Sequence, residues 1–306
     1  MKCSRFVFFS TLLMMLVFTA CEPYYEDDFG ADDFMDTAQE SDDGDYIEPF
    51  ADDLTILTSY EIQGNEIIKL KDFDVKNKYL IDQQDYSKHL AMWDYYIALI
   101  PIEHRRYISE FLIIHGEGDV GGYVEPVVQG SLDKWRMGLS IDVGGDLSTV
   151  DLQAELAYII VHEFGHVLTL NPTQVVVQEE SSCQTFHTGE GCSKVNSYIN
   201  SLFDLAWSDI YNQYSEEEAD LLYEDHKDRF VSDYAATNPG EDIAEVFTTY
   251  VIEQNVRSGH SIADKKIQLL DSYPELQSLR VQIRQVPAVR LINNKHKKYQ
   301  HARINN

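Results

Sequence analysis

Two histidines one helical turn apart, with a glutamate directly after the first, form the most chemically specific pattern in the sequence. They are His162 and His166, with Glu163 between them, in the stretch VHEFGHVL. On a helix, residues i and i+4 share a face, so both imidazoles can reach one zinc ion at about 2.0–2.1 Å. Glu163 lies beside them, where a carboxylate can take a proton from a water molecule that zinc has acidified. The pattern predicts one Zn²⁺ held by both histidines, with Glu163 as the general base.

The same pattern also arises by chance, and buried histidines often do no more than satisfy hydrogen bonds. Two features favour metal binding. Apolar residues flank the motif on both sides, so the helix is predicted to be buried, where two bare imidazoles would need partners. Gly165 is unfavourable inside a helix, by about 1 kcal/mol, and therefore predicts the close approach of another segment.

A catalytic zinc site needs a third protein ligand and an open coordination position. The best candidates lie downstream, in a helix predicted to start at Asn238-Pro239, with Pro at its first position, and to run to about Val256. Glu241 and Glu245 are one turn apart on one face of it. In the alternative interpretation, Glu241 only completes a capping box with Asn238, and Glu245 is a solvated surface charge. Spacing alone leaves both interpretations open.

These motifs resemble those of the gluzincin zinc metallopeptidases, in particular the catalytic domain of anthrax lethal factor and a group of bacterial zinc-binding metallopeptidase lipoproteins. The resemblance rests on HEFGH, followed downstream by a tyrosine and then by E-x-x-A-E-x-F. For the lipoprotein group it covers most of residues 100–256, because EF, YVEP, KW and a G-x-D strand precede the zinc helix there too. For lethal factor it is confined to the two motifs.

The resemblance implies three zinc ligands, which are His162, His166 and Glu241. It implies that Glu163 is the general base and that Tyr234, seven residues before Glu241, donates a hydrogen bond to the developing oxyanion. Glu245 would then orient a ligand histidine from outside the coordination shell. In gluzincins the strand before the zinc helix pairs with the substrate, and here that strand would be residues 135–142, through a free edge.

The sequence departs from the family in an insert over residues 171–233, which contains two cysteines and two extra helices. The insert puts the substrate specificity of lethal factor in doubt for this chain. In an oxidising compartment, Cys183 and Cys192 most simply form a local disulfide. The alternative is a metal site that uses both sulfurs and His187, although a fourth ligand is not evident nearby.

Residues 1–20 have the pattern of a lipoprotein signal peptide. Lys2 and Arg5 precede an apolar run over residues 6–18, which is shorter than the roughly 20 residues of a membrane-spanning helix. The run ends in FTAC, which resembles a bacterial lipobox with Cys21 as the lipidated residue, although Phe18 replaces the usual leucine. An ordinary secretory signal is the alternative. Either form predicts export, and lipidation predicts a membrane-anchored protein that faces the periplasm or the cell exterior.

The rest of the chain is predicted to form a tether, one domain and a tail. Residues 22–53 contain fourteen Asp and Glu and no Lys or Arg, so residues 21–53 are expected to be an acidic disordered tether. Residues 54–290 are expected to form one metallopeptidase domain, and residues 291–306 a polar basic tail. The net charge of −28 argues against nucleic acid as a partner.

The order of predicted elements indicates an α+β domain, with a small mixed sheet packed on the zinc helix and a mostly helical second half. A helix is expected over residues 86–100, followed by strands near 111–114, 121–128 and 134–143, the last half-buried by its alternation. A capping box of Ser148 and Asp151 is expected to start the zinc helix, which ends near Leu170. Further helices are expected over 196–213, after Ser215, over 239–256 and from Ser272.

Together these features predict an exported, membrane-tethered zinc peptidase that acts on a peptide or protein substrate. One alternative is a zinc amidase that acts on a cell-wall substrate. Another is a non-catalytic lipoprotein that binds a partner through the same scaffold. The presence of Glu163 argues against the last alternative, because a protein that no longer catalyses hydrolysis does not need a general base. The sequence leaves the oligomeric state open.

Overall fold

The computed structural model describes residues 46, 48–49, 54–215 and 218–293, all within one unit, Asp43–Asn306. The predicted signal peptide, the lipidation site Cys21 and most of the predicted tether and tail lie outside the described residues. Strands precede helices along most of the chain, as expected for an α+β domain. Within the described residues, no helix is both long and apolar enough to cross a membrane.

A five-stranded mixed sheet forms the first half of the domain, with strands in the order β2-β1-β3-β5-β4. Its strands are β1 (Thr55–Gln63), β2 (Glu66–Asp72), β3 (Ile108–His115), β4 (Gly122–Pro126) and β5 (Trp135–Ser140). β3 and β5 run parallel, and the other neighbours are antiparallel. Among the described strands, β2 and β4 therefore lie at the two edges.

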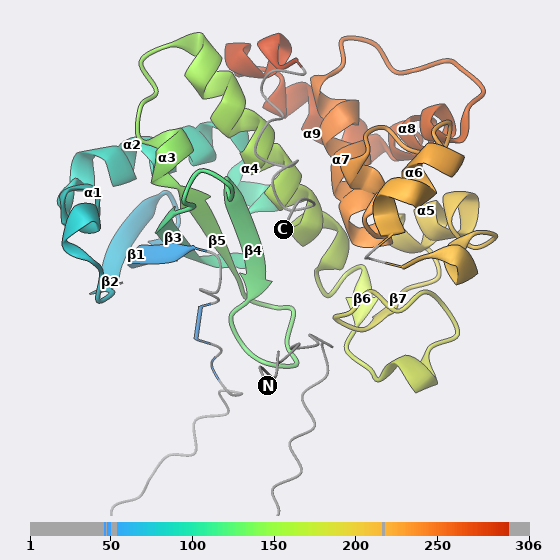
Figure 1. Cartoon of the computed structure of the whole chain (residues 1–306), viewed down its shortest axis with the longest axis horizontal. Coiled ribbons are helices and arrows are strands. Elements are labelled where there is room, and N and C mark those ends of the chain that lie inside the picture. Colours follow the sequence, from blue (N-terminus) through green and yellow to red (C-terminus); the bar gives the residue numbers. More distant parts are fainter. Residues whose placement is uncertain (1–45, 47, 50–53, 216–217, 294–306) are drawn as a thin grey trace, which may run out of the picture. The chain divides into compact units, whose positions relative to one another are not determined.

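Helices cover one face of this sheet and form the second half of the domain (Figure 1). Beside the sheet lie α1 (Leu80–Gln84), α2 (Tyr86–Leu99), α3 (Ile141–Gly144) and α4 (Val150–Leu170). The second half contains α5 (Tyr198–Ala206), α6 (Ala219–Asp225), α7 (Pro239–Ile252), α8 (Ile262–Asp271) and α9 (Pro274–Ile283). α4 runs between the two halves and is almost wholly buried, which explains why its sequence is apolar around most of its circumference.

The strand predicted over residues 134–143 differs from the prediction in length, burial and position. β5 ends at Ser140, because the Ser140 side chain accepts a hydrogen bond from Asp142 N and so caps α3. All residues of β5 are buried, and the polar side of the alternation contains Arg136, whose guanidinium lies 3.1 Å from both Glu110 and Glu125. The expectation of a half-buried strand was therefore wrong.

The expectation that residues 135–142 present a free edge was also wrong. β4 pairs along that side of β5, with Gly122 opposite Leu139 and Pro126 opposite Trp135. β4 is therefore the edge strand next to α4. The pairing joins segments that the sequence separates by a loop, so strand order could not be obtained from alternation.

Helix boundaries differ from the predictions in several places. Thr149, and not Ser148, caps α4 by accepting a hydrogen bond from Leu152 N at 3.2 Å. The helix expected over 196–213 is α5 followed by a separate 3-10 turn, Tyr211–Gln213. The helix expected to reach 256 ends at Ile252, and α8 was not predicted.

The domain makes contacts with a residue that the prediction assigned to the tether. Tyr46 forms an isolated antiparallel bridge with Val128, and its hydroxyl lies 3.4 Å from Glu110 Oε2. The guanidinium of Arg136 lies over its ring, 4.9 Å from the centroid. The ordered contacts of the domain therefore begin before residue 54.

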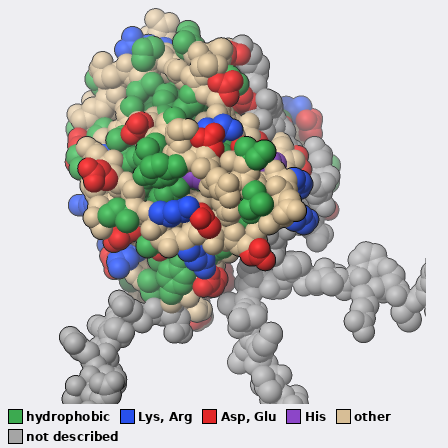
Figure 2. All heavy atoms as spheres, turned by 90° about the vertical axis from the view of Figure 1, so that its left-hand side faces the viewer, with side chains coloured by type: hydrophobic (Ala, Val, Ile, Leu, Met, Phe, Trp, Pro, Cys, Tyr) green, Lys and Arg blue, Asp and Glu red, His purple; other side chains and the backbone are tan. Residues whose placement is uncertain are grey.

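The side of the domain formed by α1 and the β1–β2 hairpin has a mixed surface (Figure 2). Apolar side chains interrupt acidic and basic ones there, and the exposed apolar residues of these elements are Ile68, Leu70 and Ile81. Isolated exposed apolar residues are ordinary on a soluble surface and carry no functional assignment here.

Candidate metal centre

The close crossing of α4 and α7 builds the site. A Cβ atom at Gly165 would lie 3.2 Å from the Cα of Ala244 in α7, so a larger residue would push the helices apart. The predicted close approach at Gly165 is therefore confirmed. Because His162 and His166 flank this glycine within one helical turn on either side, the crossing brings the start of α7 against both imidazoles.

Asn238 fixes where α7 begins. Its side chain accepts a hydrogen bond from Glu241 N at 2.9 Å, and Pro239 occupies the first turn. The capping interpretation is thus correct for Asn238. It does not exclude a metal role, because the Glu241 side chain lies against the two histidines and is free of the cap.

Three side-chain atoms form a nearly equilateral triangle. His162 Nε2 lies 3.2 Å from His166 Nε2 and 3.1 Å from Glu241 Oε2, and His166 Nε2 lies 3.4 Å from Glu241 Oε2. Ligands at about 2.0–2.1 Å from a tetrahedral ion are separated by about 3.3–3.4 Å. His162, His166 and Glu241 can therefore hold a metal ion.

A buried carboxylate orients the first histidine. Glu245, 1% exposed, has Oε1 at 3.0 Å from His162 Nδ1. If Nδ1–H donates to this oxygen, Nε2 is left with a lone pair that points into the triangle, as a metal ligand needs. Glu245 also accepts hydrogen bonds from Tyr158 at 2.7 Å and from Ser232 at 2.6 Å.

Tyr158 and Ser232 were not identified from the sequence. Tyr158 lies one turn before His162 on the same face of α4, and that i−4 spacing would have been the available signal. Ser232 has no comparable signal, because it comes from the segment before Tyr234 and meets Glu245 only in the folded chain.

The charges of the site act strongly on its own pKa values. Burial opposes a charge on His162, but its hydrogen bonds with Glu241 and Glu245 outweigh this and raise its pKa to about 10. Burial likewise opposes a charge on Glu241, but the charge of His166 and hydrogen bonds with both histidines hold its pKa well below its usual range. Without a metal, the cluster therefore takes up a proton in place of the cation.

This proton uptake predicts that the zinc-free protein loses stability in alkaline solution. Because the folded pKa of His162, about 10, exceeds the ordinary value of 6.5, its protonated form stabilises the zinc-free fold fully below pH 6.5. That contribution is lost as the pH rises through about 10. Urea unfolding of chelator-treated protein across this range should show the loss, and a His162→Asn variant should lack it. Parallel pH profiles for the two proteins would contradict the expectation.

The predicted tyrosine lies beside the first histidine, and the predicted base follows that histidine on α4. Tyr234 is 5% exposed, and its ring centroid is 5.8 Å from that of His162. A Cβ atom at Gly122 of β4 would lie 3.2 Å from Glu163 Cγ, so the Glu163 side chain lies against the edge strand. The structure therefore brings Tyr234 together with the three predicted ligands and places Glu163 against β4.

A buried ion pair holds the first turn of α7 in place. Asp242, which follows Glu241, accepts hydrogen bonds at 2.7 Å from Lys266 of α8 and from the indole of Trp207. All three side chains are fully buried. Removing one partner of such a pair leaves the other charge buried and unpaired, which strongly destabilises the fold. The pair therefore fixes the position of α7 relative to α5 and α8.

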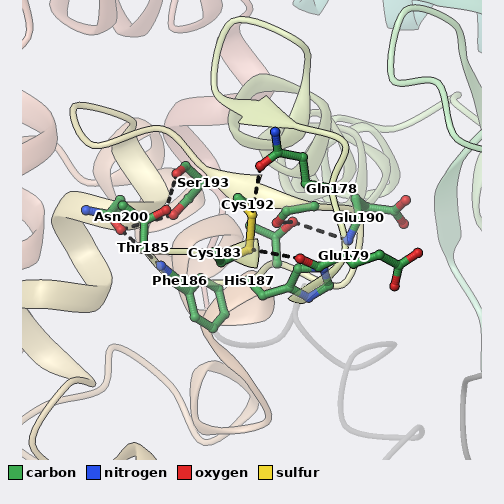
Figure 3. The surroundings of a disulfide bond; sticks show 12 residues. Gln178, Glu179, Cys183, Thr185, Phe186, His187, Glu190, Cys192, Ser193 and Asn200 are labelled. Carbon is green, nitrogen blue, oxygen red and sulfur yellow. Dashed lines mark hydrogen bonds between the residues drawn. A yellow bond between two sulfur atoms is a disulfide. The ribbon is translucent and has the colours of Figure 1, made fainter. Parts of the chain in front are cut away.

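The predicted disulfide between Cys183 and Cys192 is confirmed, with the two Cα atoms 5.3 Å apart (Figure 3). It excludes a metal site that uses both sulfurs. The bridge links Cys192 of β7 (Cys192–Ser193) to the loop that joins it to β6 (Val175–Val176), its antiparallel partner. Asn200 of α5 fastens this loop by accepting hydrogen bonds from Ser193 Oγ at 3.0 Å and Phe186 N at 3.3 Å.

The disulfide hairpin, residues 175–193, begins five residues after α4 ends.

Removing the disulfide is expected to destabilise the fold. Closing a loop of this length restricts the unfolded chain by about 2.5 kcal/mol in the chain-entropy description. The Cys183→Ala/Cys192→Ala variant should lower the free energy of unfolding in urea by about that amount. Reduction of the parent protein serves as the matched control. An unchanged unfolding midpoint in both would contradict the prediction.

Comparisons with protein-family models, with curated proteins and with solved structures found no match for this chain. The chemistry of the centre must therefore be inferred from its own residues and their geometry.

Proposed function

We propose that this protein is a zinc-dependent peptidase of the gluzincin type. The observation that carries the proposal is the triangle of His162 Nε2, His166 Nε2 and Glu241 Oε2, with sides of 3.1–3.4 Å, on a helix where Glu163 directly follows the first histidine. A purely structural cluster would have no need of the additional carboxylate of Glu163. When bound there, zinc supplies Lewis-acid polarisation of a carbonyl and lowers the pKa of a coordinated water.

Residues of the chain would carry out the proton transfers and stabilise the developing negative charge. Glu163 accepts the proton of the attacking water and returns it to the leaving amine, as a general base and then a general acid. Tyr234, beside His162, donates a hydrogen bond to the carbonyl oxygen as negative charge develops on it. Glu245 keeps His162 in the tautomer that leaves Nε2 available.

The substrate would lie along β4. This strand is at the edge of the sheet, and its residue Gly122 approaches Glu163 closely. An extended peptide that adds to β4 as a further strand would have its backbone positioned by main-chain hydrogen bonds, with one scissile carbonyl near the metal cluster.

We also propose that the domain is exported and held at a membrane through lipid on Cys21. The Cys21→Ser variant should then remain unprocessed or be released into the soluble fraction, because the acyl acceptor is missing. Membrane fractionation with immunoblotting measures this, and an Arg5→Lys variant, which keeps the positive charge before the apolar run, serves as the control. A variant that sediments with membranes and has the mature mass of the parent would contradict lipidation at Cys21.

A digest of a peptide library by the zinc-loaded protein tests the peptidase proposal. Cleavage that stops on removal of zinc and returns when zinc is restored is the expected result. Cleavage of cell-wall amides alone would favour the amidase. Stoichiometric zinc without any hydrolysis would favour the non-catalytic scaffold.

A further inference from the structure

Three arginines face a pocket at the far end of α7. The pocket has a volume of about 490 Å³ and is lined by Arg280, Arg284 and Arg290, with two glutamines and the aliphatic side chains of Ile252 and Val281. With a rise of 1.5 Å per residue, the end of α7 lies roughly 16 Å from Glu241 at its start. The pocket is therefore separate from the metal centre.

Two of these arginines are positioned by the carboxyl end of α7. Arg280 donates to the carbonyls of Tyr250 and Glu253, both at 2.6 Å. Arg284 donates from Nη1 to three successive carbonyls at 2.6–2.9 Å, those of Val251, Ile252 and Glu253. Capping of a helix C-terminus explains these bonds.

Capping does not explain the third arginine or the remaining donors. Arg290 bonds no carbonyl of α7, and its Nε donates instead to the carbonyl of Arg284 at 2.8 Å. Within the described part of the chain, no acceptor is bonded to Arg280 Nη1, to Arg284 Nε and Nη2, or to the two terminal nitrogens of Arg290. These donors can therefore serve a ligand.

The charge of the arginine cluster is not neutralised by neighbouring carboxylates of the described chain. Glu253, whose backbone carbonyl both Arg280 and Arg284 contact, directs its carboxylate to Arg257 at 2.6 Å. Burial lowers the pKa of Arg284, and the positive charges of Arg280 and Arg290 lower it further. Three like charges are thus held together in a chain whose net charge is −28.

The helix dipoles offset only part of this charge. α7 and α9 both end at the pocket, and a helix C-terminus is equivalent to about −0.5 charge. The two helix ends therefore leave about two of the three positive charges unbalanced. An anion with two charges and several oxygen atoms would complete the arrangement.

We propose that this pocket is a binding site for a phosphate group. Guanidinium groups match the oxygens of phosphate in a forked, charge-assisted geometry, and several of them suit a tetrahedral oxyanion better than a single carboxylate. Ile252 and Val281, the latter 57% exposed, add apolar surface beside the arginines. The same chemistry fits a soluble organic phosphate or the headgroup of an anionic phospholipid.

Calorimetric titration of the full chain with inorganic phosphate, with chloride at equal ionic strength as the reference, tests the site. Arg290→Gln is the informative variant, because Arg290 is exposed and its side chain makes a single hydrogen bond to the described part of the chain, so the fold should survive its loss. Loss of one charge-assisted hydrogen bond should weaken phosphate binding about 10- to 100-fold. Arg284→Lys, which keeps the charge and loses the fork, should also weaken it, and Arg106→Gln, a change at an exposed arginine elsewhere, should not.

A second arm of the test distinguishes the two phosphate sources. Cosedimentation with phosphatidylglycerol vesicles, and with phosphatidylcholine vesicles as reference, is measured on the Cys21→Ser chain, so that no lipid anchor contributes. Binding to phosphatidylglycerol that Arg290→Gln abolishes assigns a lipid headgroup. Binding of inorganic phosphate without vesicle binding assigns a soluble phosphate. If the parent binds neither probe, or Arg290→Gln binds as the parent does, the proposal is overturned.

Discussion

Replacing Glu163 with glutamine is expected to abolish hydrolysis by several orders of magnitude while leaving zinc bound. Glu163 is not one of the three residues that can hold the metal ion, so an amide of the same shape should leave the ion in place. The amide cannot accept the proton of the attacking water, so the rate of the chemical step should fall and the zinc content should not. The measurements are kcat on a peptide substrate and zinc per chain.

A matched change at an exposed glutamate controls for the loss of negative charge. Glu179→Gln removes one charge from the disulfide hairpin, outside the metal cluster, and should retain nearly parental activity. If Glu163→Gln remains active, Glu163 is not the general base. If Glu163→Gln loses its zinc, Glu163 is a zinc ligand.

The second large effect is expected at Glu241, and it should differ from that at Glu245. Glu241 Oε2 lies within 3.4 Å of both histidine Nε2 atoms, whereas Glu245 contacts His162 on the opposite nitrogen, Nδ1. Glu241→Ala should therefore abolish stoichiometric zinc. Glu245→Ala should weaken zinc binding roughly 10- to 100-fold, as the loss of a residue that orients a ligand does.

Zinc titration of the folded variants separates the two roles. Glu245→Gln provides the conservative comparison, since its amide oxygen can still accept the His162 proton, and it should bind zinc more tightly than Glu245→Ala. Circular dichroism should establish that each variant is folded, because Glu245 is buried with three hydrogen-bond donors around it. Parental binding by Glu241→Ala with no binding by Glu245→Ala would reverse the assignment.

The metal centre was predictable because each of its two motifs consists of residues that are close together in the sequence. His162 and His166 occupy one face of a helix through their spacing, and Asn238-Pro239 fixes the start of the helix that carries Glu241. Gly165 added a long-range hint, since only the approach of another backbone explains a glycine in that helix. The choice between Glu241 and Glu245 came from the resemblance, and the distances now agree with it.

The sheet was predictable only in part, because strand order depends on pairing between distant segments. The alternation over residues 134–143 identified a strand but gave it the wrong end, and the resemblance gave that strand a free edge that it does not have. Ser140 ends β5 by capping α3, and β4 covers the side that was expected to be free. Arg136 looked like a solvent-facing residue because its two carboxylate partners come from other strands.

Contacts between elements that are remote in sequence were the hardest features to predict from the sequence. Ser232 reaches Glu245, and Lys266 reaches Asp242, only after α7 has packed against its neighbours. Neither residue has a spacing that marks it. The arginine cluster is similar. Arg280 lies in α9 and Arg284 caps its end one turn later, but both side chains are positioned by carbonyls at the end of α7, which is remote in sequence.

A crystal of the purified protein, with diffraction recorded on both sides of the zinc absorption edge, tests the central claim most directly. We expect one anomalous peak per chain, within about 2.0–2.2 Å of His162 Nε2, His166 Nε2 and a carboxylate oxygen of Glu241. The absence of a peak from zinc-supplemented protein, or a peak bound by other residues, would contradict the account.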